Sequence, residues 1–490
     1  MTIRNFNRIK ALLFNNVTTK QTIFKNTFWL ALSSGVGRLF TFFLFIYVAR
    51  ILGATEYGKF TFALAFVGLL VIFSDLGLSR ITVRELSQDR EREKEYSALL
   101  SLKLLLILGT LIAVLIGAFF ISSDPNIRKV IWILAGYVMI GNFAQIIYVF
   151  LEARQQMEHE ALAKILEAVL HTGFGLFVIF NFPSVENLAY GYLIGVSVFM
   201  TLFLTFFHFK IYCLRFSWNT LIWRKYLKMS WPLALAGFFG AIYNHIDTVM
   251  LGSLGQITQA GWYNAAYGIA TAAIIPATII STSFFPALNK AFKETKEKFQ
   301  EIWNYHMETM IFLSIPLMIG GIVLAPRIIN FIFNPTFSPS ILAFQILIIM
   351  TGIIILYSPF YLLLIASGQQ KKIFWATLLG AIINVILNLI LIPRFSLYGA
   401  AFATVITWLS IFFLLFKLTL KFTSINPLNL KVLLSFIGAI FSSIPMYFVI
   451  SQPQIYHLHI LFSVLIGAGV YSICLYGYKK GIVKLIKKYN

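Results

Sequence analysis

The feature that most constrains this chain is a series of apolar runs, each about 20 residues long, separated by short polar breaks. A run of that length crosses the roughly 30 Å hydrocarbon core of a bilayer as one helix. Only 12% of the residues are charged, whereas a soluble protein carries about 25%. The sequence therefore predicts an all-α protein that crosses the membrane many times, and it excludes a water-soluble enzyme.

Fourteen apolar runs are long enough to be membrane spans. The first begins near Asn26 and is too long for the core of a secretory signal peptide, so we expect it to be retained. The predicted spans are 26–49, 60–80, 99–121, 129–151, 160–181, 187–209, 230–252, 262–284, 307–325, 341–366, 373–392, 397–416, 432–450 and 456–478.

The positive charges of the loops indicate the orientation of these spans. With a cytoplasmic N-terminus, the cytoplasmic segments hold 30 Lys and Arg residues and the opposite side holds six. The positive-inside rule then predicts a multi-pass protein of the cell (inner) membrane with both termini in the cytoplasm. The same rule accounts for the net charge of +21 without a nucleic-acid partner.

The loops exclude further classes of protein. The longest outer loop, 326–340, leaves no room for an extracellular catalytic domain. The chain contains no Gly-x-x-x-x-Gly-Lys-Ser/Thr motif, which excludes an ATPase of the ABC type within it. Neither Cys213 nor Cys474 has a CxxC or His neighbour, so the sequence predicts no metal and no redox cofactor. Because the loops are short, we also expect that the protein is not an enzyme.

Two dipeptides, Leu-Gly and Tyr-Gly, each recur about 200 residues later in the chain, which indicates an internal repeat. Leu-Gly occurs at 52–53 and 251–252, and Tyr-Gly at 190–191 and 398–399. Spans 1–6 and 7–12 are therefore predicted to be parallel repeats that enclose a central cavity, with spans 13 and 14 as an addition. The predicted domains are a basic, amphipathic cytoplasmic N-terminus at 1–25, six-helix bundles at 26–228 and 229–428, and helices 13 and 14 with a basic tail at 429–490.

Several short motifs follow one another along the chain in a fixed order. They are Asn26-Thr27-Phe28-Trp29, Ala49-Arg50-Ile51-Leu52-Gly53 with Glu56-Tyr57-Gly58, Ser74-Asp75-Leu76-Gly77-Leu78 with Arg84-Glu85-Leu86, Trp231-Pro232 through Asp247 to Leu251-Gly252, Asn384 with Asn388, and Tyr398-Gly399-Ala400-Ala401. In these motifs the chain resembles the polysaccharide-exporting flippases, often called Wzx-like, of the multidrug/oligosaccharidyl-lipid/polysaccharide exporter superfamily.

The resemblance implies two pseudo-symmetric six-helix bundles that form a V-shaped central cavity. It also implies flipping of an undecaprenyl-pyrophosphate-linked oligosaccharide, such as an O-antigen, capsule or exopolysaccharide repeat unit, by alternating access. We expect H+ or Na+ as the coupling ion, and the lipid-linked glycan, membrane lipids and a polysaccharide polymerase or ligase as partners. A lipid II flippase and a cation-coupled multidrug exporter remain alternatives. A membrane polymerase or glycosyltransferase is less well supported, because such enzymes have a large outer loop.

Ionisable residues inside the predicted spans are the candidates for the substrate site, because charge is costly in hydrocarbon. Arg38 lies near the middle of span 1 and is predicted to attract the pyrophosphate or acidic sugars, since a guanidinium forms forked bonds to phosphate. Lys164, Glu167 and His171 share one face of span 5 and are predicted to line the cavity, with Lys164 and Glu167 close enough to pair.

A second group of charged residues is predicted to serve ion coupling or gating. Asp247 is the only acid of span 7, where it could bind an ion or lock an outer gate, and Asp75 closes span 2 next to basic residues. The group comprises Asp247, His245, Asp75, Arg50, Arg80 and Arg84. We expect Lys103, in contrast, to extend to the membrane surface.

Overall fold

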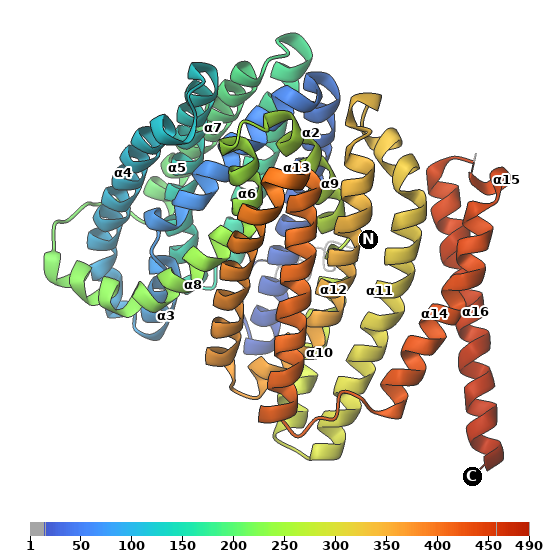
Figure 1. The fold of residues 1–490 in the computed structure, drawn as a ribbon. Coiled ribbons are helices and arrows are strands. Elements are labelled where there is room, and N and C mark those ends of the chain that lie inside the picture. The colour runs from blue at the N-terminus through green and yellow to red at the C-terminus, as the bar shows by residue number, and fades with distance from the viewer. Residues whose placement is uncertain (1–13, 15, 457, 490) are drawn as a thin grey trace, which may run out of the picture. The chain divides into compact units, whose positions relative to one another are not determined.

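The computed structural model describes residues 14, 16–456 and 458–489 (Figure 1). Most of the predicted N-terminal segment, 1–25, therefore lies outside the described residues. Within the described part, all regular elements are helices, and eleven are long and apolar enough to cross a membrane. The prediction of an all-α polytopic membrane protein is confirmed.

The chain divides into two compact units, Met1–Val249 and Met250–Asn490. The boundary between the units falls inside helix α8, whereas the domain limits drawn from the sequence stay a prediction. The first unit contains α2 (Thr19–Leu70), η1 (Val71–Ser74), α3 (Leu78–Gln88), η2 (Arg90–Glu95), α4 (Tyr96–Ile121), α5 (Pro125–Ala153), α6 (Met157–Asn181), α7 (Val185–Lys210) and most of α8 (Thr220–Ser253).

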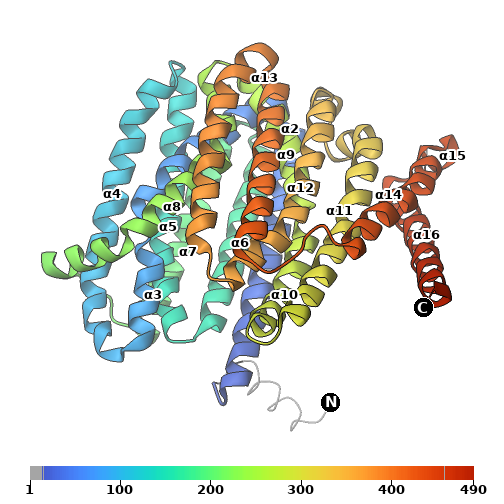
Figure 2. The ribbon, with the colours of Figure 1, turned by 60° about the horizontal axis from the view of Figure 1, so that its bottom comes forward.

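In the first unit, α2 packs against α5 and α6, and α7 packs against α5 and α6. Helices α4 and α5 lie side by side in both views (Figures 1 and 2). Helices α4 and α7 expose large apolar side chains, Phe120 and Phe209 respectively, as expected for a surface that faces lipid.

The second unit is built around α11 and α12, which pack against each other. Helices α14 and α16 pack against α11 and against one another (Figure 2). The unit contains α9 (Ile257–Ala272), α10 (Ile275–Phe292), α11 (Lys296–Ile332), η3 (Pro335–Phe337), α12 (Ser340–Ala366), α13 (Gln370–Phe422), α14 (Leu430–Ser451), α15 (Pro453–Tyr456) and α16 (Ile460–Tyr489).

Two helices are longer than a single span. Helix α2 covers predicted span 1 and residues 60–70 of span 2, and it changes direction at Gly53 (φ 75°). Helix α13 covers predicted spans 11 and 12 and changes direction at Ser396 (φ 55°). Helix α8 covers the predicted span 230–252. Each of the fourteen predicted spans thus falls wholly or largely on helix within the described residues.

The predicted second span, 60–80, ends earlier in the structure than expected. Helix α2 stops at Leu70, and the chain turns through Leu76 and Gly77, which both have positive φ. A Cβ atom at Gly77 would lie 2.7 Å from the Cβ of Leu233, so this turn has no room for a side chain. The turn places Asp75 between α2 and α3.

Three helices end in the same left-handed turn, in which the amide of a glutamine donates to the carbonyl of a leucine five residues earlier. These turns end α5 at Gln155, α8 at Gly255 and α12 at Gly368. Gly53 and Gly255 both have positive φ, 75° and 76°.

Candidate functional site: a polar network in the first unit

All the residues predicted from the sequence to act in the mechanism lie in the first unit, so their contacts within it can be described directly. The centre of this network is a buried ion pair. The Lys103 ammonium of α4 donates to Asp75 Oδ1 at 2.7 Å and to Asn142 Oδ1 of α5 at 3.1 Å. Ser79 Oγ donates to the same Asp75 oxygen at 2.5 Å. The cluster thereby connects α3, α4 and α5.

The expectation that Lys103 extends to the membrane surface is wrong. Its side chain is fully buried, and the Asp75 side chain is 22% exposed. Desolvation of an ion is expensive in a low-dielectric interior, and the hydrogen bonds of the pair to Asn142 and Ser79 offset part of that cost. Lys103 is therefore a member of the site that analysis of the sequence missed, because hydropathy does not show which spans are neighbours.

The polar stripe of α6 is present, with a different pairing from the predicted one. Lys164 binds Glu160, one turn earlier, at 2.5 Å, and its ammonium also lies 5.1 Å from the centre of the Tyr148 ring. Glu167 instead accepts a hydrogen bond of 3.0 Å from the hydroxyl of Tyr148 in α5. The structure therefore pairs Lys164 with Glu160, and Tyr148 contacts both Lys164 and Glu167.

His171 lies one turn beyond Glu167 and is surrounded by aromatic rings. Its ring centre is 3.9 Å from that of Tyr192 and 5.2 Å from that of Tyr137. Its Nε2 atom is buried and has no hydrogen-bond partner among the described residues. Along α6, the partners of the stripe thus change from charged side chains at Lys164 to aromatic rings at His171. Its role as a lining of the cavity stays a prediction.

Arg38 lies on an exposed stretch of α2, where Gly35 and Gly37 have open space around them. Within the described residues, it has no ion pair or hydrogen bond. The neighbouring Leu39 is 60% exposed. Its predicted role in binding the substrate headgroup stays a prediction.

The gating residues do not form one cluster around Asp75. Arg84 binds Glu85, with 2.8 Å between Nη2 and Oε1, and Arg80 is exposed. Asp75 is paired with Lys103 instead of these arginines. The predicted roles of Arg80 and Arg84 stay predictions.

The remaining two candidates of span 7 lie in α8. Asp247 is only 6% exposed. His245 packs against Gly68 of α2, because a Cβ atom at Gly68 would lie 2.8 Å from His245 Nε2. Arg50, in α2, is exposed and has further interactions in the structure. A side chain at position 68 would displace the His245 ring, which makes this contact a sensitive part of the α2–α8 packing.

A second buried ion pair closes the end of the unit at the turn between α5 and α6. Lys25 of α2 binds Glu158 at 2.6 Å and donates to the Gln155 carbonyl at 3.1 Å. Asn26 donates to the Gln155 side-chain oxygen at 2.7 Å. These contacts hold Gln155 in its left-handed conformation (φ 58°). Nothing in the spacing of the sequence predicted this contact, since its partners are more than 120 residues apart.

Comparison with known proteins places this architecture among membrane transport proteins. Residues 23–292 match the family model described as polysaccharide biosynthesis protein. The probable low-salt glycan biosynthesis flippase Agl15 of Haloferax volcanii is 24% identical over 74% of this chain and 76% of its own length. The capsular polysaccharide biosynthesis protein CapF of Staphylococcus aureus is 22% identical over 78% of this chain and 96% of its own length.

A solved structure of similar fold is the lipid II flippase MurJ in its inward closed conformation. The TM-score is 0.77 at 20% sequence identity, and the match covers 92% of this chain and 99% of the other. At this identity the likeness concerns the fold alone. The shared fold is that of a polytopic helical membrane protein.

Proposed function

Because the chain belongs to the polysaccharide biosynthesis protein family, we propose that it is a flippase for a lipid-linked glycan. Its substrate is an undecaprenyl-pyrophosphate-linked oligosaccharide, such as an O-antigen, capsule or exopolysaccharide repeat unit. The names of two relatives, a glycan biosynthesis flippase and a capsular polysaccharide protein, support this class of substrate. The observation that carries the proposal is a network of charged side chains inside helices that are otherwise apolar.

A charged pyrophosphate and its sugars cannot cross hydrocarbon unaided, because moving charge out of water is costly. In the proposed mechanism Arg38 attracts the pyrophosphate by forked hydrogen bonds. The polar stripe of Lys164, Glu167 and His171 meets the sugars, while the lipid tail stays in the bilayer. The two halves alternate between access from either side of the membrane.

We propose that the buried pair of Asp75 and Lys103 couples this cycle to a cation gradient. A proton or Na+ that binds the Asp75 carboxylate competes with the Lys103 ammonium for the same oxygen atoms. Release of Lys103 then loosens the contact with Asn142, so that ion binding changes how α3, α4 and α5 are held together. Asp247 and His245 of α8 take part in the same ion coupling. Arg50, Arg80 and Arg84 contribute positive charge where the cavity opens and closes on the two sides of the membrane.

The proposal includes an orientation. Both termini lie in the cytoplasm, and the protein resides in the cytoplasmic membrane, as supported by 30 basic residues in the predicted cytoplasmic segments against six on the other side. A polysaccharide polymerase or ligase is the expected downstream partner, because it consumes the flipped unit on the outer face.

The decisive test is the fate of lipid-linked units when the gene is deleted. A strain that lacks this flippase should accumulate lipid-linked oligosaccharide on the cytoplasmic side, where an added impermeant glycosidase cannot reach it in intact cells. A lipid II flippase would instead leave lipid II inside and weaken the cell wall. A drug exporter would change drug resistance without any accumulated glycan. Accumulation on the outer face would contradict the proposal and indicate a polymerase.

A further inference from the structure

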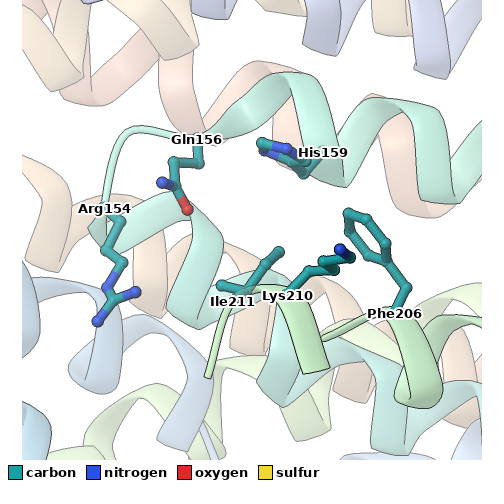
Figure 3. Close-up of a pocket in the computed structure, with 6 residues that line it drawn as sticks. All are labelled: Arg154, Gln156, His159, Phe206, Lys210 and Ile211. Atoms are coloured by element: carbon teal, nitrogen blue, oxygen red, sulfur yellow. The ribbon is translucent and has the colours of Figure 1, made fainter. Parts of the chain in front are cut away.

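We propose that a pocket at the turn between α5 and α6 and at the end of α7 binds the phosphate of an anionic membrane phospholipid. The pocket has a volume of about 440 Å³ and lies within the first unit. Figure 3 shows its side chains around an open centre, with α6 on one side and the last turn of α7 on the other. The lining residues are Arg154, Gln156, His159, Phe206, Lys210 and Ile211.

The pocket is electropositive because its cations are only partly balanced. Lys210 is exposed and has no ion pair or hydrogen bond within the described residues. Glu93 holds the Arg154 guanidinium by two bonds, 3.0 Å to Nε and 2.6 Å to Nη2, and leaves Nη1 for another acceptor. The same guanidinium lies 4.2 Å from the centre of the Phe150 ring, which fixes its plane.

Two further polar side chains of the pocket are unsatisfied. Gln156 Oε1 and His159 Nδ1 are both buried and have no hydrogen-bond partner among the described residues. The nearest carboxylate, Glu158, lies 3.9 Å from His159 Nδ1 but is bound more closely by Lys25, at 2.6 Å. The amide of Gln156 can turn its NH2 group toward a ligand, since the two orientations of an amide are nearly isosteric. A phosphate group would supply acceptors to these side chains.

The surroundings of the pocket favour a lipid over a free anion. Leu162, three residues beyond His159 on α6, is 47% exposed. Leu202, one turn before Phe206 on α7, is 51% exposed, and Phe206 itself is 42% exposed. These side chains form an apolar surface next to the charged pocket. A phospholipid fits both parts, with its phosphate in the pocket and its acyl chains along the apolar surface.

The position of the pocket agrees with the proposed orientation of the chain. The turn at 153–157 and the segment after Lys210 are both predicted to be cytoplasmic, and the structure brings them to one pocket. Basic pockets between helices on this side of a membrane bind anionic headgroups. Lipid bound here would tie together η2, the turn between α5 and α6 and the end of α7.

The test is binding of short-chain phosphatidylglycerol to the purified full-length protein in detergent, measured by native mass spectrometry or thermophoresis. Phosphatidylcholine with the same chains is the reference lipid. We expect phosphatidylglycerol to bind more tightly than phosphatidylcholine and Lys210→Gln to weaken its binding about fivefold. Lys210→Arg should keep the affinity of the wild type. Arg215→Gln removes an exposed charge five residues further along and should also leave binding unchanged.

Equal affinity of the wild type and Lys210→Gln would overturn the proposal, as would equal affinity for the two lipids. If inorganic phosphate displaces the lipid at an equal concentration, the pocket is a site for a free anion and the lipid proposal is wrong. Binding of undecaprenyl pyrophosphate is measured in the same way. If Lys210→Gln weakens it as strongly as it weakens binding of phosphatidylglycerol, the pocket belongs to the substrate path, which would overturn the proposal. Thermal unfolding of each variant without lipid verifies that it is folded. None of these measurements depends on transport, so the outcome is separate from that of the proposed function.

Discussion

The Lys103 ammonium lies 2.7 Å from the Asp75 carboxylate, and the lysine side chain is completely buried. Removal of either charge leaves the other without its partner in a low-dielectric interior. We expect Lys103→Gln to lower the free energy of unfolding by about 3 kcal/mol, the range found for broken buried pairs. Unfolding of the purified protein by titration with a denaturing detergent measures this change.

The double variant Asp75→Asn with Lys103→Gln separates stability from transport. Two neutral amides can still hydrogen-bond, so most of the lost stability should return. Export of polysaccharide should remain absent if the pair is the coupling site. A double variant that exports normally would show that the pair is only structural.

Arg38→Ala tests the proposed phosphate contact. Because Arg38 has no partner within the described part of the first unit, its loss should not destabilise the protein. We expect surface polysaccharide to disappear while the protein level in the membrane, measured by immunoblot, stays normal. Lys94→Ala, which removes an exposed charge of η2, is the matched control and should export like the wild type. Wild-type export by Arg38→Ala would remove this residue from the mechanism.

The pairing on α6 can be measured with double-mutant cycles. Lys164 and Glu160, 2.5 Å apart, should show a coupling energy of about 0.5–1 kcal/mol, limited by the partial exposure of the lysine. Lys164 and Glu167, which form no ion pair with each other in the described structure, should couple more weakly. The two cycles use the same lysine variant, Lys164→Met, with Glu160→Gln or Glu167→Gln, and unfolding free energies as the readout. Stronger coupling to Glu167 would contradict the structure.

The left-handed turn at Gly255 predicts a conformational effect. An added Cβ meets open space there, but the φ of 76° disfavours any L side chain, so Gly255→Ala should destabilise the protein by about 1 kcal/mol. Gly268 lies inside α9 and also has open space around it, so Gly268→Ala should be neutral or stabilising by up to about 1 kcal/mol. Equal effects of the two substitutions would show that the backbone conformation at Gly255 is not the cause.

The membrane-spanning helices could be predicted because each one leaves a local signal, an apolar run of sufficient length. Partners across helices leave no such signal. Lys103 has no acid within helical spacing, and its partner Asp75 precedes it by 28 residues, with α3 and η2 between them. The pairing of Lys164 with Glu160 could have been found, because a spacing of four residues on a helix brings side chains together. The contact between Lys25 and Glu158 could not have been found from the spacing of the sequence.

The continuous course of α2 from Thr19 to Leu70 has a mechanical consequence. No flexible loop separates the first two membrane crossings, so their relative angle is fixed by the backbone torsions at one residue, Gly53. Arg38 lies in the segment of α2 before Gly53, and the segment after Gly53 leads to Asp75. If the first segment tilts, either the torsions at Gly53 change or the second segment moves with it. Spectroscopic labels placed on either side of Gly53 would report that angle directly in the membrane.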